Sequence, residues 1–168
     1  MKNIITLLAI LATLQLFVSC TDDSNNSYYN NPCFTELPYT EQMAIDAVLI
    51  DEYLSEQGIT AQIDESGLRY VILEEGEGGR PTVDSTVNVT YRGTLLENNN
   101  LFDENTDGIE LPLYAVIDGW KIGIPLIKEG GKIMLYIPSL LGYGCQGGGT
   151  TIPSNANLIF EVEIIEII

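Results

Sequence analysis

The sequence has 168 residues and carries 24 Asp and Glu against 7 Lys and Arg, a formal net charge of −17. Such an acidic surface begins with unfavourable electrostatics toward a phosphate backbone, so no nucleic-acid partner is expected. The sequence contains no histidine, which excludes Ser-His-Asp catalysis, Cys-His catalysis and the usual His-based zinc sites.

The N-terminus has the pattern of an export signal. Lys2 precedes an apolar run over residues 4–18, and the run ends in Ser19-Cys20. A small residue directly before a cysteine resembles a bacterial lipobox, which predicts a lipoprotein signal peptide over residues 1–19 and lipid on Cys20. A transmembrane anchor is the alternative, although the run is short for a span of roughly 20 residues. We therefore expect a cell-envelope protein, lipid-anchored through Cys20 in the outer membrane and facing the periplasm or the cell surface.

Residues 20–38 are predicted to form a flexible tether, because residues 21–31 are Asp, Ser, Asn and Tyr without an apolar period. If Cys20 carries lipid, Cys33 in the tether and Cys145 remain as a pair. Thiols outside the cytosol can be oxidised, so a disulfide between Cys33 and Cys145 and two free thiols both stay open.

Residues 39–65 are predicted to form a helical extension. Thr40 offers an N-cap, Gly58 is a natural C-terminal residue, and apolar residues recur at helical spacing, at Met43, Ala47, Ile50 and Leu54. This amphipathic helix would either dock on the domain that follows or dimerise the protein.

From residue 66 onward the helical period gives way to strands. Residues 68–73, 87–95, 132–137 and 158–167 are apolar-rich or alternate apolar and polar side chains, and a further short extended piece is expected near residues 111–116. Only short helices fit between them, such as about two turns over residues 120–127. The predicted fold class is α+β, with an antiparallel sheet.

Six separated motifs stand in this region: Val89-Thr90-Tyr91-Arg92-Gly93, Leu101-Phe102-Asp103, Val116-Ile117-Asp118-Gly119-Trp120, Gly130-Gly131-Lys132, Leu141-Gly142-Tyr143-Gly144 and Ile152-Pro153. In order and spacing they resemble the FKBP family of peptidyl-prolyl isomerases. The resemblance covers residues 66–168 and implies a twisted antiparallel sheet curled around one short helix. The substrate proline would enter a cavity between the sheet and that helix.

The resemblance also implies which residues form the pocket. Trp120 would be its floor, and its apolar walls would be Tyr91, Phe102, Val116, Ile117, Ile152 and Phe160. The Ile117 amide and the Tyr143 hydroxyl would hold substrate carbonyls, and Asp103 would lie beside the twisting bond or fix neighbouring groups. No cofactor and no metal are implied. Expected partners are proline-containing segments of unfolded or exported proteins, and macrolides such as rapamycin would occupy the same cavity.

An aromatic pocket suits this chemistry on physical grounds. Rotation about a prolyl bond is slow because amide resonance sets a barrier of about 18–20 kcal/mol. A dry pocket that favours the less polar, twisted amide lowers this barrier without a nucleophile. A reduction of about 4 kcal/mol would give roughly a thousandfold acceleration.

Three departures from the family pattern favour an alternative function. Residues 104–108 contain no Arg to restrain Asp103, the loop after Gly108 looks short, and Gly147-Gly148-Gly149 predicts a flexible flap over the pocket. The alternative to an active isomerase is therefore a low-activity peptide-binding or chaperone module that uses the same cavity.

Two other motifs compete for the same residues. Gly142-x-Gly144-x-x-Gly147 fits a dinucleotide fingerprint, but Pro153 and further glycines follow it instead of a helix. Asp103-x-Asn105-x-Asp107-Gly108 fits the first half of a calcium loop, but Tyr114 stands where the bidentate Glu should be. Neither motif is expected to form a site.

Overall fold

The computed structural model describes residues 38–168. The predicted signal peptide, the lipidation site Cys20, the tether up to residue 37 and Cys33 lie outside these residues. Within residues 38–168, no helix is both long enough and apolar enough to span a bilayer.

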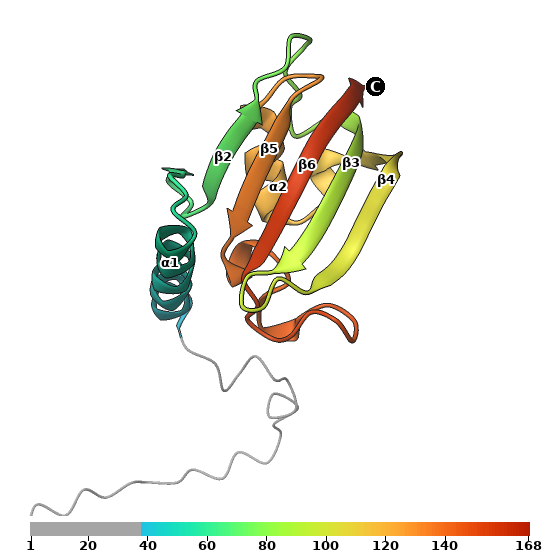
Figure 1. Cartoon of the computed structure of the whole chain (residues 1–168). Helices are drawn as coiled ribbons and strands as arrows, with labels where there is room; N and C mark the ends of the chain where they lie inside the picture. Colours follow the sequence, from blue (N-terminus) through green and yellow to red (C-terminus); the bar gives the residue numbers. More distant parts are fainter. Residues whose placement is uncertain (1–37) are drawn as a thin grey trace, which may run out of the picture. The chain divides into compact units, whose positions relative to one another are not determined.

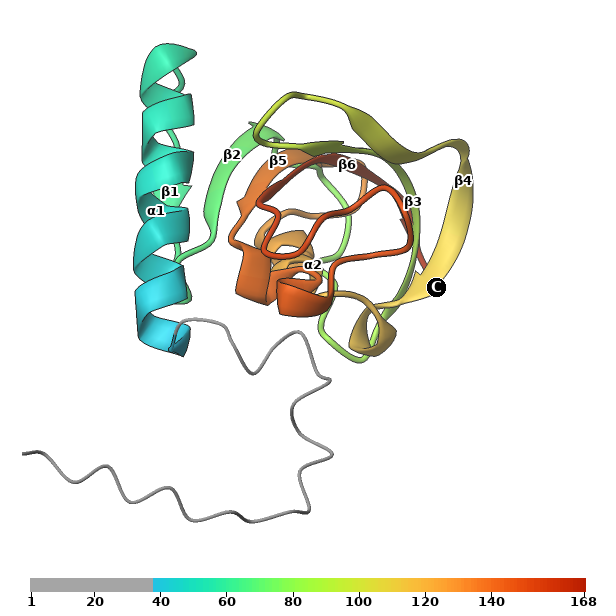
Figure 2. The same ribbon diagram turned by 90° about the horizontal axis from the view of Figure 1, so that it is seen from below.

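One antiparallel sheet of six strands, in the order β1-β2-β5-β6-β3-β4, forms the body of the domain (Figure 1). Its strands are β1 (Gln62–Ile63), β2 (Arg69–Glu74), β3 (Thr86–Leu95), β4 (Leu101–Pro112), β5 (Lys132–Ile137) and β6 (Leu158–Ile167). The sheet curls around the short helix α2 (Asp118–Gly123), as Figure 2 shows from below. The predicted α+β class and the curled antiparallel sheet are confirmed.

The longest strand, β4, is where the sequence prediction was wrong. An extended piece was expected only near residues 111–116, but β4 already begins at Leu101, and a 3₁₀ turn η3 (Leu113–Ala115) follows it. β4 is an edge strand paired only with β3. Most of its side chains are exposed, so its sequence lacks the alternating apolar pattern by which strands are recognised.

Two glycines seat α2 against the sheet. A Cβ on Gly119 would lie 2.6 Å from the side chain of Ile137, and a Cβ on Gly123 would lie 2.5 Å from that of Leu135. Residues four apart share one face of a helix, so both glycines face β5 and let the helix approach it closely. The neighbouring Trp120 is then only 4% exposed. A second 3₁₀ turn, η4 (Ile124–Leu126), completes the predicted two turns.

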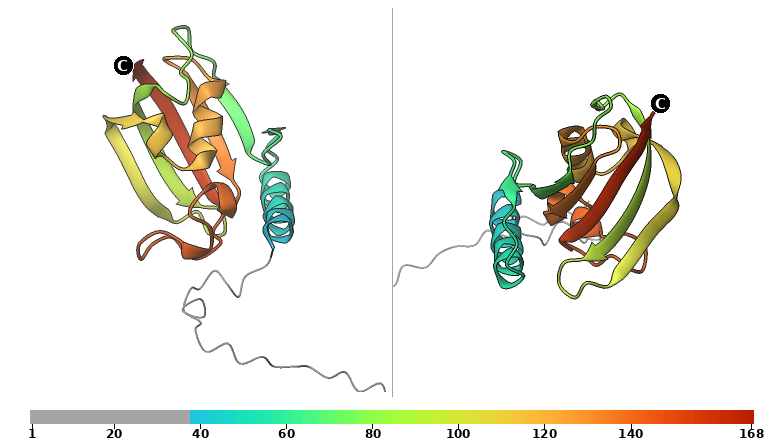
Figure 3. Two further views of the ribbon diagram at one scale, coloured as in Figure 1. Left: turned by 180° about the vertical axis from the view of Figure 1, so that it is seen from behind. Right: turned by 45° about the horizontal axis from the view of Figure 1, so that its top comes forward.

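The main core fills the space between α2 and the concave face of the sheet. Alternate residues of the central strands point into it, among them Ile133 and Leu135 of β5 and Phe160 and Val162 of β6. The left view of Figure 3 shows α2 lying across this face of the sheet. The same alternation sends Met134, Tyr136 and Ile159 to the opposite face.

Helix α1 (Tyr39–Glu56) packs on that opposite face through a second apolar cluster, which includes Ile50, Leu54, Tyr136 and Ile159. The prediction that the helix docks on the domain is confirmed. The predicted cap was wrong: the helix begins at Tyr39, after Pro38, so Thr40 lies inside its first turn.

The buried face of α1 also differs from the predicted one. Its fully enclosed positions are Gln42, Asp46, Ile50 and Leu54. Met43 and Ala47, which were expected to face the domain, are only half-buried. The face therefore carries two polar residues at its N-terminal end, where an apolar stripe was expected.

Candidate functional site

A cavity of about 240 Å³ lies between the sheet and the segment that leads into α2. Nine residues line it: Tyr91, Asp103, Leu111, Ala115, Val116, Ile117, Trp120, Tyr143 and Phe160. Strands β3, β4 and β6, the start of α2 and the segment after β5 all contribute to it. The cavity thus gathers residues that are far apart in the sequence.

The structure brings seven of the nine predicted site residues to this cavity. Phe102 and Ile152 do not line it. Phe102 supports the pocket from behind, since its ring packs edge-on against Phe160 at a centroid distance of 5.4 Å and an angle of 82°. Ile152 is 8% exposed and belongs to the main core. It sits next to Gly148, where a Cβ would lie 3.1 Å from Ile152 and 3.3 Å from Tyr143.

Two residues of the lining, Leu111 and Ala115, were not predicted as site residues. Leu111 lies near the end of β4 and Ala115 ends the 3₁₀ turn η3, and no motif of the family pattern includes either residue. Only the position of Ala115 directly before Val116 could have indicated it.

Aromatic rings in edge-to-face contact form the inner end of the cavity. The ring of Trp120 lies 5.2 Å from Phe160 at 84° and 5.2 Å from Tyr91 at 79°. Edge-to-face pairs of this kind are favoured over face-to-face stacks because of the ring quadrupole. Gly93 makes room for them, since a Cβ there would lie 2.7 Å from both Phe102 and Phe160. The result is a rigid apolar surface at the bottom of the pocket.

Three polar groups lie at the edge of this aromatic surface: the Tyr91 hydroxyl, the Asp103 carboxylate and the Tyr143 hydroxyl. The Tyr91 hydroxyl donates a hydrogen bond of 2.7 Å to Oδ2 of Asp103. Burial, and then the hydrogen bond and charge of Asp103, raise the pKa of Tyr91 to about 12. Burial and the charge of Asp103 also raise the pKa of Tyr143. Both hydroxyls therefore stay protonated at neutral pH, and Tyr143, with 40% of its surface exposed, can donate to a ligand.

Tyr91 restrains Asp103 in place of the missing Arg. Asp103 lies opposite Gly93 in the β3–β4 register, so its carboxylate projects from the edge strand next to the Tyr91 ring. A hydrogen bond to a carboxylate is among the stronger hydrogen bonds in proteins, about 1.5–3 kcal/mol. The hydrogen bond from Tyr91 thus orients the Asp103 carboxylate from within the pocket.

The glycine-rich segment after Tyr143 forms a closed turn. The Gly148 and Ile152 backbones exchange two hydrogen bonds, from Gly148 N to Ile152 O at 2.9 Å and from Ile152 N to Gly148 O at 3.0 Å. Gly147 has φ of +64°, a conformation that favours glycine. The glycines therefore serve a hydrogen-bonded turn beside the pocket, and the expected flexibility of this segment stays a prediction.

The competing motifs do not form sites. Residues 103–108 belong to strand β4, and Oδ1 of Asn105 accepts a hydrogen bond from the Gly108 amide at 2.8 Å, which is not the geometry of a calcium loop. No group of three potential metal ligands converges anywhere in residues 38–168. The segment Gly142–Gly147 enters only a three-residue 3₁₀ turn, η6 (Gly144–Gln146), so it presents no helix to a phosphate. Cys145 of this turn is disulfide-bonded, and Cys33, whose pairing with Cys145 the sequence leaves open, lies outside the described residues.

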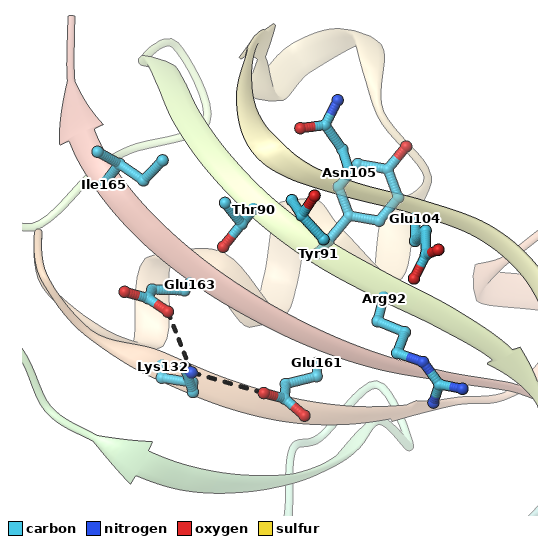
Figure 4. A pocket seen from close by; sticks show the side chains of 10 residues that line it. Thr90, Tyr91, Arg92, Glu104, Asn105, Lys132, Glu161, Glu163 and Ile165 are labelled. Carbon is cyan, nitrogen blue, oxygen red and sulfur yellow. Dashed lines mark ion pairs between the residues drawn. The ribbon is translucent and has the colours of Figure 1, made fainter.

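A larger cavity of about 440 Å³ lies on the opposite face of the sheet (Figure 4). Charged side chains dominate it: Nζ of Lys132 lies 3.0 Å from Glu163 and 3.6 Å from Glu161. These residues form cross-strand ion pairs on a solvated surface, which contribute little to stability or to selective binding. The smaller, aromatic cavity is therefore the candidate site.

The curled sheet and the aromatic cavity above α2 together define the class of prolyl isomerases that enclose a proline ring between a sheet and a short helix. The chain belongs to this family: the model of the FKBP-type peptidyl-prolyl cis-trans isomerases matches residues 78–165.

Individual relatives agree with this assignment. The chain is 43% identical over 104 residues to a probable FKBP-type isomerase, FkpA, of Neisseria meningitidis, covering 61% of this chain and 38% of that protein. It is 42% identical over 106 residues to an FK506-binding protein of the same species, covering 60% of this chain and 96% of that protein. The crystal structure of FkpA from Escherichia coli superposes with a TM-score of 0.65 at 34% identity, over 76% of this chain and 60% of that one. The alignments span only 38–47% of the length of the first curated relatives.

Replacing Asp103 with Ala is expected to lower the pKa of Tyr91 from about 12, because the hydrogen bond and the charge that favour the protonated phenol are lost. Burial, the larger cause, should still keep the pKa above 10.0. In the wild type the unfolded chain loses this proton first, so the associated stability is present below pH 10 and disappears between pH 10 and about 12.

Carbon-13 NMR of labelled tyrosine rings measures this titration. Asp107→Ala, an exposed carboxylate on the same strand, is the matched control and should leave the Tyr91 titration unchanged. An unaltered Tyr91 titration in Asp103→Ala would contradict the assigned interaction.

Proposed function

We propose that this protein is a prolyl cis-trans isomerase that acts on proline-containing segments of unfolded or exported proteins. The observation that carries the proposal is the apolar cavity over Trp120, walled by Tyr91 and Phe160 and bordered by Asp103 and Tyr143. Membership of the FKBP-type family supports it.

The cavity suits catalysis of a rotation without bond cleavage. A proline ring bound against Trp120 would be shielded from water, and its amide would lie in an environment of low dielectric constant. The twisted amide has lost resonance and is less polar than the planar one, so such an environment favours it. Because only interactions that are stronger in the transition state accelerate a reaction, this differential solvation is the main effect of the pocket.

Two donors would orient the substrate. The Tyr143 hydroxyl stays protonated and is partly exposed, so it can donate to a substrate carbonyl. The backbone amide of Ile117, at the N-cap position of α2, would donate to a second substrate carbonyl. Among the described residues this amide donates to no backbone acceptor. Asp103, held by Tyr91, would lie beside the twisting bond or fix neighbouring groups.

Phe102 and Ile152 act in this proposal as supports and do not touch the substrate. Phe102 fixes the Phe160 ring, and Ile152 packs beside Tyr143 through Gly148. A contact such as that between Phe102 and Phe160 contributes roughly 0.5–1.5 kcal/mol beyond its buried area.

A refolding assay limited by prolyl isomerisation tests the function. The wild type should accelerate the slow phase, and Asp103→Ala and Phe102→Ala should each lower kcat/KM by about tenfold, the equivalent of roughly 1.4 kcal/mol. Leu101→Ala, at an exposed neighbouring position on β4, is the control and should retain full activity. Failure of the wild type to accelerate refolding would exclude the enzyme function.

A peptide-binding or chaperone module is the second candidate, favoured by the absence of an Arg near Asp103. Binding of apolar peptides without acceleration of refolding would support it. Rapamycin is expected to compete with substrate in either case, because the family resemblance implies that macrolides occupy this cavity; one relative is named an FK506-binding protein. Trp120 is the only tryptophan, so its fluorescence reports occupancy of the pocket directly.

We further propose that the domain is tethered to the outer membrane through lipid on Cys20, which would place the isomerase where exported chains fold. The wild type should partition into the detergent phase of a Triton X-114 extraction and Cys20→Ser into the aqueous phase, since a lipid chain contributes about 0.8 kcal/mol per buried methylene. Aqueous partitioning of the wild type would exclude the anchor. Protease treatment of intact cells then distinguishes the cell surface from the periplasm, because only a surface-exposed domain is lost without lysis.

A further inference from the structure

Asp46 of α1 is a completely buried carboxylate outside the pocket, with 0% of its surface exposed. Its Oδ1 accepts a hydrogen bond from Nε2 of Gln42 at 2.8 Å. Its Oδ2 accepts two from Ser139, one from the backbone amide at 2.9 Å and one from the hydroxyl at 2.7 Å. Both oxygens are therefore bonded, and two of the three bonds join α1 to a segment 93 residues away.

Contacts other than this carboxylate also dock α1. The helix already buries Ile50 and Leu54 against Tyr136 and Ile159, and Asp51 pairs with Arg69 through two bonds of 2.9 and 2.8 Å. A buried charge costs several kcal/mol of desolvation, and an apolar residue of similar volume is often neutral or better at such a position. The effect of Asp46 therefore lies in the segment that it binds, which begins at Ser139.

Asp46 holds the beginning of the segment that carries Tyr143. Ser139 starts the 3₁₀ turn η5 (Ser139–Leu141), whose last bond runs from the Gly142 amide to Ser139 O at 3.0 Å. Tyr143 is the next residue. Only this short turn separates Ser139 from Tyr143, so a shift of Ser139 would be passed on to Tyr143.

The other side of Tyr143 is fixed by the loop before β6. The Asn155 amide donates to Gly144 O at 2.9 Å, and the Ser154 hydroxyl donates to Cys145 O at 2.6 Å. Oδ1 of Asn157 shares the Ser139 amide with Asp46, at 3.0 Å. Tyr143 thus stands between two anchored points, and α1 supplies one of them.

We propose that Asp46 is a positioning residue, through which helix α1 sets the place of the Tyr143 hydroxyl in the pocket. The inference rests on the proposed isomerase function for its kinetic consequence, but the positioning itself is a structural claim. The N-terminal extension then contributes to the site, because the domain without α1 would lose the acceptor of the Ser139 hydroxyl and keep only Asn157 as acceptor of the Ser139 amide.

A double-mutant cycle on the mature full-length protein tests the kinetic part. Asp46→Asn removes the charge at nearly constant shape and should lower kcat/KM for a proline tetrapeptide about five- to tenfold. In the Tyr143→Phe background the same substitution should lower kcat/KM by less than about twofold. Asp51→Asn is the matched control: it removes an ion pair that docks the same helix to β2 and leaves η5 untouched, so kcat/KM should stay within about twofold of the wild type. Additive losses in the cycle, or an equal loss in Asp51→Asn, would overturn the proposal.

A second variant and a second measurement allow the proposal to be refuted if Asp46→Asn does not fold or the protein is not an isomerase. If Asp46→Asn does not fold, Ser139→Ala removes only the hydroxyl contact and should show the same non-additivity with Tyr143→Phe. NMR of carbon-13-labelled tyrosine should show the Tyr143 ring signals displaced in Asp46→Asn and unchanged in Asp51→Asn, whether or not the protein is an isomerase. Unchanged Tyr143 signals in Asp46→Asn would overturn positioning even in an active enzyme, whereas displaced signals in an inactive protein would refute only the proposed function.

Discussion

The contact between Trp120 on α2 and Phe160 on β6 is the interaction on which the rest of the structure depends. The two rings meet edge to face at 5.2 Å, and this is feasible only because glycines open the space around them. Gly119 and Gly123 let α2 approach β5, and Gly93 leaves room beside Phe160. One close approach therefore joins the helix to the sheet, closes the core and leaves an aromatic surface facing the cavity.

The two faces of the sheet have separate roles that follow from the alternation of side chains along each strand. The concave face buries the core and the pocket, while the convex face carries the α1 cluster on one side and cross-strand ion pairs such as that of Lys132 with Glu163 on the other. Asp46 and Ser139 connect the two, because they join the helix on the convex side to the segment that delivers Tyr143 to the pocket. The helix α1 thus contacts a segment that leads to the site, although α1 itself lines no part of the cavity.

The sequence predicted the parts of the fold that have a regular pattern. Strands β3 and β6 alternate apolar and polar residues over much of their length, β5 is an apolar run, and the predicted bounds of all three agree with the structure to within a residue. The family resemblance placed Tyr91, Trp120 and Phe160 in one pocket. What could not be predicted has no local pattern: β4 is an edge strand with mostly exposed side chains. The buried face of α1 includes Asp46, whose burial is favourable only because Ser139, distant in sequence, supplies two donors.

Exchange NMR of a proline tetrapeptide, with the protein at a small fraction of the peptide concentration, tests the central claim most directly: that the cavity over Trp120 lowers the barrier to prolyl rotation. The account predicts cross-peaks between the cis and trans forms at mixing times below about a second, since the uncatalysed exchange takes tens to hundreds of seconds. It also predicts that rapamycin abolishes these cross-peaks while changing the fluorescence of Trp120. Exchange at the uncatalysed rate, with peptide bound at the Trp120 pocket, would contradict it.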